Sequence, residues 1–132
     1  MKLFFGVISA LVLSQCNASA SCTAAERQVW FNRVDFSNFY EACARKTRGL
    51  SVKTKTVECL ASKYSEPVMR RECLVCFGEA AQCAARGCSL ACAMSSSGER
   101  CLACMAHKCY GALRQCVGAR SDSELPPPPS KD

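Results

Sequence analysis

This sequence of 132 residues lacks several features that mark large functional classes. It contains one histidine, His107, which excludes most catalytic constellations that depend on that residue type. No window alternates regularly between apolar and polar residues, and no Asn-Gly or Asp-Gly pair occurs, so β-hairpins are not expected. The apolar stretch at the amino terminus, residues 3–13, is too short to span a bilayer, and no other run reaches the length of about 18 apolar residues that a membrane-spanning helix needs. The chain is also too short for a multidomain enzyme.

Cysteine, in contrast, is abundant, with 13 residues. Residues 1–20 combine Lys2, an apolar stretch and the small residues Ala18-Ser19-Ala20, which is the pattern of a secretory signal peptide. Its removal takes away Cys16 and leaves an even set of cysteines, which in an exported chain predicts six disulfides. A bacterial lipid anchor on Cys16 is the alternative, and it would also take that cysteine out of the pairing. We therefore expect a secreted, extracellular protein.

Helix-start and helix-end signals divide residues 21–120 into four helices, so the expected fold class is all-α: a small disulfide-rich helical domain with a C-terminal antiparallel helical hairpin. The second of these helices is short and basic and covers about residues 51–63. Residues 121–132 contain four consecutive prolines and almost no apolar side chains. This composition indicates an extended, mobile, disordered tail.

The first helix is expected to begin with a capping box, in which Thr23 is followed three residues later by Glu26. It is expected to end near Gly49, since glycine suits the left-handed position after a helix. Asp35 or Ser37 could instead cap a shorter helix, so the first half of this element stays open.

The third helix is expected to start at Ser65-Glu66-Pro67, where a capping residue precedes an early proline, and to run toward Met94. The fourth is expected to start with a second capping box, Ser96 with Glu99, and to end just before Gly118. The residues between these two helices form the turn of the hairpin.

The cysteine spacings on the two sides of this turn mirror each other. Going back from Cys92 the steps are four, five and seven residues, and going forward from Cys101 they are three, five and seven. Antiparallel helices rise equally per residue, so mirrored spacings place cysteines at equal heights. The spacing thus predicts a nested ladder of four disulfides: Cys92–Cys101, Cys88–Cys104, Cys83–Cys109 and Cys76–Cys116.

The twist of a straight helix opposes this ladder. Cys76 and Cys83 share a face, but Cys88 lies about 140° further round, so a kink or break at Gly87 is needed for all of these sulfurs to reach one partner. Cys73 is left to bond one of three cysteines nearer the amino terminus, while the other two pair: Cys22, Cys43 and Cys59.

Two C-x2-C pairs offer a competing interpretation. Residues 73–76 and 101–104 are separated by 24 residues, slightly more than a common zinc spacing. In an exported chain with eight further cysteines we favour disulfides over structural zinc, and we expect no metal and no cofactor. A thioredoxin-like redox role lacks the required βαβ context.

Two resemblances to known families concern single segments. Residues 104–111, with His107 among cysteines, resemble the catalytic helix of secreted phospholipases A2, but Lys108 stands where that family has aspartate, and the glycine-rich calcium loop is absent. That activity is therefore not expected. Residues 88–104 resemble the α-hairpinin scaffold of small defence and toxin peptides. The C-x3-C pair at Cys88 fits its pattern, the C-x2-C pair at Cys101 departs from it, and the resemblance implies architecture only.

Basic residues are concentrated in one segment. Without residues 1–20 the chain carries 16 basic and 11 acidic side chains, and Glu58 is the single acid within the 19-residue basic segment. Its candidate partner-binding residues are Arg45, Lys46, Arg48, Lys53, Lys55 and Lys63. Such a segment favours an extracellular or host protein as partner, with an anionic membrane surface or a sulfated glycan as alternatives. Nucleic acid is not expected, since no binding motif is present.

A cluster of five aromatic residues in the first helix is expected to form the core against the hairpin, or in part a partner-facing patch: Trp30, Phe31, Phe36, Phe39 and Tyr40. Together these features predict a secreted, non-enzymatic binding protein, an effector, toxin-like protein or signalling ligand, that presents a rigid basic helical surface. A protease inhibitor with Arg100 as bait and a structural component of an extracellular coat are the alternatives.

Overall fold

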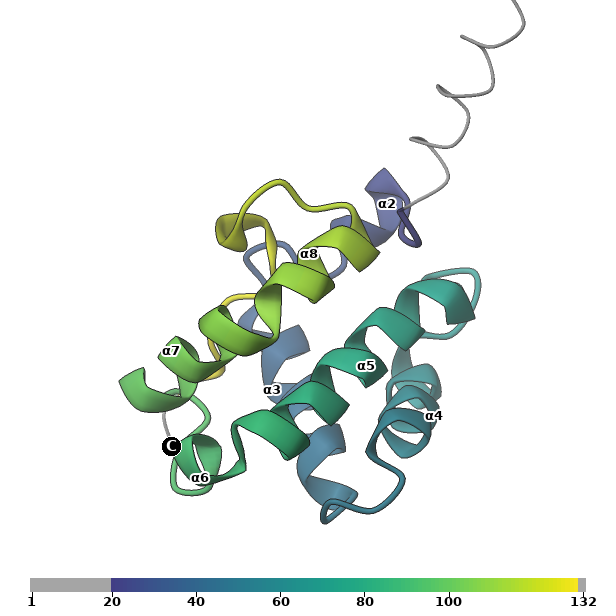
Figure 1. Ribbon diagram of the computed structural model, residues 1–132. Helices are drawn as coiled ribbons and strands as arrows, with labels where there is room; N and C mark the ends of the chain where they lie inside the picture. Colours follow the sequence, from purple (N-terminus) through teal and green to yellow (C-terminus); the bar gives the residue numbers. More distant parts are fainter. Residues whose placement is uncertain (1–19, 131–132) are drawn as a thin grey trace, which may run out of the picture.

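Residues 20–130 are described by a computed structural model, and within them every regular element is a helix (Figure 1). The predicted all-α, disulfide-rich fold class is therefore confirmed. The predicted signal peptide falls, apart from Ala20, outside the described residues. The helices are α2 (Ala24–Arg27), α3 (Val34–Lys46), α4 (Val52–Tyr64), α5 (Arg71–Gly87), α6 (Ser89–Cys92), α7 (Glu99–Lys108), α8 (Tyr110–Val117) and the 3-10 helix η1 (Asp122–Glu124). None of them is long and apolar enough to cross a bilayer.

The nested ladder predicted from the cysteine spacing is the pairing in the structure. Its four disulfides join α5 and α6 to α7 and α8: Cys76–Cys116, Cys83–Cys109, Cys88–Cys104 and Cys92–Cys101. The twist conflict is resolved by a break directly after Gly87, where Cys88 has a non-helical backbone. A second break at Cys109 separates α7 from α8. The hairpin therefore consists of two broken arms.

Of the two further disulfides, one attaches the amino-terminal part to this hairpin and the other joins two helices of that part to each other. Cys22 bonds Cys73 at the start of α5, and Cys43 on α3 bonds Cys59 on α4. This is one of the three arrangements that the sequence left open.

The prediction of one continuous first helix from residue 23 is wrong, because this part of the chain forms two separate helices. The capping box at Thr23 forms, but α2 is one turn long and α3 begins only at Val34. Asn32 between them has a positive φ of 55°, a conformation that asparagine tolerates better than most residues. This break turns Trp30 into the core, where the side chain is fully buried. The centroid of its ring lies 5.0 Å from the centroid of the Phe77 ring.

The expected aromatic core is present, with one exception. Phe36 is fully buried between Trp30, Tyr64 and Phe77, and the hydroxyl of Tyr40 donates a hydrogen bond to the Phe77 carbonyl. Phe31 lies outside this cluster and keeps 42% of its surface exposed.

The start of α5 also differs from the sequence prediction. Ser65-Glu66-Pro67 does not open this helix, which begins at Arg71. Arg70 is held in an extended conformation because its backbone N–H donates to the Glu26 carboxylate at 2.6 Å and its guanidinium pairs with the same group at 3.0 Å. A tertiary contact, which local sequence signals do not encode, therefore sets this helix boundary.

The proline-rich tail is packed on the domain, so the prediction of a mobile tail does not hold for residues 121–130. Leu125 is buried, and the Trp30 indole N–H donates to the Glu124 carbonyl at 3.0 Å. Ser37 on α3 donates to the Pro127 carbonyl. An extended proline segment makes no internal hydrogen bonds, so its carbonyls are free to accept from side chains of the domain.

Close contact between α4 and α5 depends on Gly78. A Cβ at this position would lie 2.6 Å from Cγ2 of Val57 and 2.8 Å from the Lys53 carbonyl oxygen. We expect Gly78→Ala to force the helices apart and to lower the free energy of unfolding by about 1–3 kcal/mol in guanidinium titrations with the disulfides intact. Gly111→Ala is the matched control, because its Cβ would meet only the Arg114 guanidinium at 3.9 Å. Equal stability of the two variants would contradict this account.

The buried Glu26 carboxylate predicts a loss of stability in acid. Burial opposes its ionisation, but hydrogen bonds from Arg70 and Thr23 outweigh this and lower the pKa of Glu26 from 4.5 to about 2. A depressed pKa adds stability that is complete above pH 4.5 and is lost as the pH falls toward 2, by about 1.4 kcal/mol per pH unit. Denaturant titrations across this range should show a steeper loss for the wild type than for Glu26→Gln, and parallel curves would refute the assignment.

Candidate functional site

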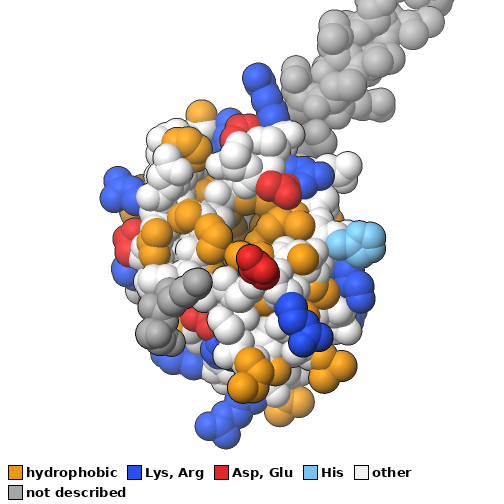
Figure 2. All heavy atoms as spheres, turned by 90° about the vertical axis from the view of Figure 1, so that its left-hand side faces the viewer, with side chains coloured by type: hydrophobic (Ala, Val, Ile, Leu, Met, Phe, Trp, Pro, Cys, Tyr) orange, Lys and Arg blue, Asp and Glu red, His pale blue; other side chains and the backbone are white. Residues whose placement is uncertain are grey.

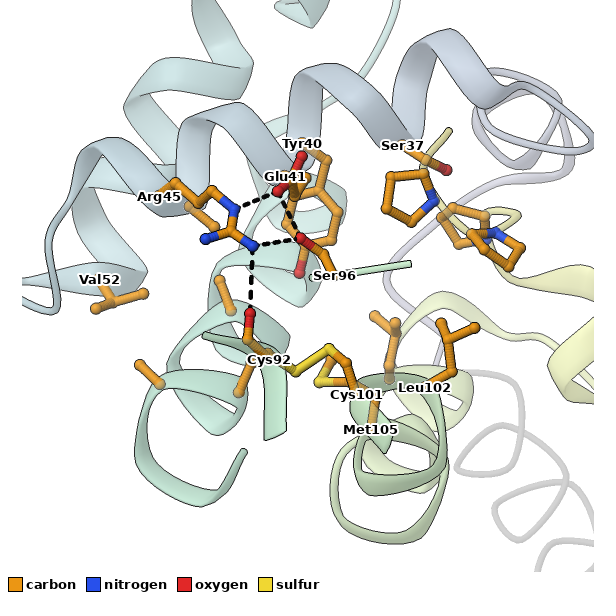
Figure 3. A pocket seen from close by; sticks show the side chains of 18 of the residues that line it. Ser37, Tyr40, Glu41, Arg45, Val52, Cys92, Ser96, Cys101, Leu102 and Met105 are labelled. Carbon is orange, nitrogen blue, oxygen red and sulfur yellow. Dashed lines mark hydrogen bonds and ion pairs between the residues drawn. A yellow bond between two sulfur atoms is a disulfide. The ribbon is translucent and has the colours of Figure 1, made fainter. Parts of the chain in front are cut away.

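A cavity of ≈ 350 Å³ lies between α3, α5, the α6–α7 segment and the tail. In Figure 3 its α3 residues lie on one side, and residues of α6 and α7 lie on the other. Figure 2 views the molecule from the side of α7 and shows hydrophobic side chains gathered in a hollow on this face, with charged side chains around them. The volume falls in the range of small-molecule sites, about 300–1,000 Å³.

Small side chains make this space. On α5 the three alanines Ala81, Ala84 and Ala85 share one face and line the cavity, and Ala44 faces it from α3. An apolar gap of this kind loses packing energy, so helices that are free to move close it. Here α5 is bound by disulfides to α8 and, at the start of α6, to α7, which fixes these walls of the cavity relative to one another.

The remaining wall is formed by the tail and α7. Leu125 and the four prolines that follow it line the cavity, together with Leu102 and Met105. The tail thus takes part in the site because it is anchored on α3 through Ser37 and on α2–α3 through Trp30. The lining is predominantly apolar and is contributed by segments far apart in the sequence.

A polar network joins α3 to the α6–α7 segment at the edge of the cavity (Figure 3). The Arg45 guanidinium pairs with Glu41, donates to the Ser96 hydroxyl at 2.7 Å and donates to the Cys92 carbonyl at 3.2 Å. Ser96 in turn donates to Glu41. Burial disfavours the charge on Glu41, but the hydrogen bonds from Ser96 and Arg45 prevail and hold the pKa of that carboxyl below its usual range.

This network corrects one prediction from the sequence. Ser96 does not cap α7; the helix starts after Gly98 and has no side-chain cap, although Glu99 stands in its first turn. The Ser96 hydroxyl is used by α3 instead, where it meets both Glu41 and Arg45.

The polar groups of the lining are engaged in structural contacts. The Tyr40 hydroxyl donates to the Phe77 carbonyl at 2.7 Å, and its burial raises the pKa of Tyr40, so the phenol stays protonated. Ser37 donates to the Pro127 carbonyl. The Ser96 hydroxyl lies beside the Glu41 carboxylate, which is already paired with Arg45. The arrangement can enclose an apolar molecule.

The six basic residues predicted as a partner surface do not share one direction. Arg45 turns toward the α6–α7 segment, Lys53 pairs with Glu79 on α5 at 3.4 Å, and Lys63 lies over the ring of Phe39 at 5.0 Å. The other three are exposed without an ion pair within residues 20–130: Lys46, Arg48 and Lys55.

The remaining candidates have clear positions. The four sulfurs of the two C-x2-C pairs lie in four separate disulfides, with Cys22, Cys116, Cys92 and Cys88 as partners. His107 is exposed on α7 and is not part of the cavity lining. Arg100 is exposed in the first turn of α7, where its backbone is helical and not extended as in an inhibitory loop.

Sequence reasoning missed the cavity. The signal that could have indicated it is the spacing of Ala81, Ala84 and Ala85, which puts only methyl groups on one face of a long amphipathic helix. No family model, curated protein or solved structure matches the chain.

Proposed function

We propose that this protein is a secreted, non-enzymatic binding protein whose ligand is a small apolar molecule held in the cavity. The observation that carries the proposal is the ≈ 350 Å³ space lined by alanine, proline, leucine and methionine side chains. Burial of apolar ligand surface against such a lining is favourable by about 25 cal/mol per Å². Six disulfides fit an oxidising, extracellular environment.

The size and lining of the cavity restrict the ligand. At about 30 Å³ for each heavy atom, comparable with a water molecule in the liquid, the space holds a group of roughly a dozen heavy atoms. A short aliphatic chain or a fused ring hydrocarbon fits this description. A polar substituent would have to lie at the edge, near Glu41, Arg45 and Ser96, since the interior wall is formed by apolar groups.

Preorganisation supports a binding role. The α5, α6 and α7 walls of the cavity are fixed relative to one another by disulfides, so this part of the site requires little ordering when a ligand binds, which favours affinity. The basic surface, by contrast, supports recognition of a protein partner less well, because Arg45, Lys53 and Lys63 are directed toward three different neighbours within the fold.

Filling the cavity tests the proposal. We expect Ala84→Leu to occupy the space between α5 and α3, to lower the affinity for the fluorescent apolar probe 1-aminonaphthalene at least about tenfold, and to raise the free energy of unfolding by about 0.5–2 kcal/mol. Fluorescence titration measures the first effect and guanidinium unfolding the second.

Ala103→Leu is the matched control, because Ala103 is exposed on α7 and does not line the cavity. It should bind the probe as the wild type does. The proposal is overturned if the wild type shows no saturable fluorescence change, or if Ala84→Leu folds and binds the probe unchanged.

A further inference from the structure

We propose that the end of the molecule formed by α6 and the α3–α4 turn docks on a membrane surface that carries anionic lipids. Leu90 and Met94 are 93% and 94% exposed at this end, and Leu50 in the α3–α4 turn is 67% exposed. Single exposed apolar residues are common on proteins, whereas contiguous exposed apolar patches mark interaction sites. This inference goes beyond the proposed function and does not depend on it.

Leu90 and Met94 lie on one side of the same short helical segment. They are four residues apart, and the helical backbone continues beyond α6 at Ala93, with φ −59° and ψ −42°. Residues four apart on a helix are neighbours on its surface. Disulfides at Cys88 and Cys92 hold this segment to α7, so both side chains project from a rigid support.

The α3–α4 turn that carries Leu50 lies at the same end. Arg45, near the end of α3, reaches the Cys92 carbonyl at 3.2 Å, and Gly49 lines the cavity together with Ser89 and Cys92 of α6. Figure 1 places α6 and the α3–α4 connection at the lower end of the molecule. At that lower end Figure 2 shows protruding hydrophobic side chains beside basic ones.

Basic residues stand in the segments that carry or adjoin the apolar side chains. Arg86 stands four residues before Leu90, Arg100 is next to the cysteine that bonds Cys92, and the ammonium group of Lys108 lies 3.1 Å from the Gly87 carbonyl. Lys46 and Arg48 add two exposed charges from the α3–α4 side. Within residues 41–50 and 86–108 the acidic residues are Glu41, which is paired with Arg45, and the exposed Glu99.

This combination fits a lipid surface better than a protein groove. We call the end of the molecule formed by α6 and the α3–α4 turn the tip. The apolar side chains protrude from this tip, so they can enter the headgroup region of a bilayer without a complementary pocket. Basic side chains around the tip would then meet the negative surface potential of anionic lipids. A protein partner of ordinary affinity needs a larger complementary area than such a tip offers.

Flotation of the oxidised protein with lipid vesicles tests the proposal. We expect strong binding to phosphatidylcholine vesicles that contain about 30% phosphatidylserine. The affinity for vesicles of phosphatidylcholine alone should be lower by a factor of about ten or more. The double variant Leu90→Ser/Met94→Ser should lose at least about tenfold in binding to the anionic vesicles. Arg86→Gln/Arg100→Gln should reduce the preference for phosphatidylserine and the sensitivity to salt.

Val34→Ser/Val68→Ser is the matched control. These valines are 41% and 47% exposed, at the start of α3 and in the α4–α5 connection, away from the tip, so this variant should bind vesicles as the wild type does. The proposal is overturned if the wild type binds neither vesicle, if Leu90→Ser/Met94→Ser binds unchanged, or if the tip instead drives self-association in sedimentation velocity. Titration with 1-aminonaphthalene should be the same for the tip variant and the wild type, which keeps this test separate from the cavity.

Discussion

The nested disulfides between the two arms of the hairpin are the constraint on which the rest of the structure depends. They fix α5 and α6 against α7 and α8 at four successive heights. Each arm of the hairpin must break for these disulfides to form, one at Cys88 and the other at Cys109. The reason is that a straight helix cannot direct all of its cysteine sulfurs toward the opposite arm. Native disulfides of this kind contribute about 2–4 kcal/mol each, which allows a domain of modest size to keep an apolar space open inside it.

The four disulfides of the ladder could be predicted from the sequence because mirrored spacings around the turn define equal heights along two antiparallel helices. The partners of Cys22, Cys43, Cys59 and Cys73 could not, because no such symmetry relates them. Helix ends with purely local causes were also predictable, as with the capping box of Thr23 and the left-handed Gly118 after α8. Two helix starts were wrong because tertiary contacts determine them. The hydroxyl of Ser96 serves Glu41 on α3, and Arg70 before α5 is fixed by Glu26.

The cavity could not be predicted for a different physical reason. Alanine favours helices and is found in cores, so Ala81, Ala84 and Ala85 indicate a packed helix until the distance to the opposite wall is known. That distance depends on disulfides and on a tail whose composition indicates disorder. The tail packs because the indole of Trp30 and the hydroxyl of Ser37 meet its carbonyls, contacts that composition alone does not reveal.

One segment, residues 89–96, connects the two sites that we propose. Its inner side lines the cavity through Ser89, Cys92 and Ser96, and its outer side exposes Leu90 and Met94. Covalent bonds hold the segment to α7, whereas its described link to α3 is the hydrogen-bonded network of Arg45. Hydrogen bonds at a half-exposed site are weaker than disulfides, so the edge of the cavity between α3 and this segment is the side at which the fold can open with least cost. A surface that binds Leu90 and Met94 would therefore contact the same segment that forms this edge of the cavity.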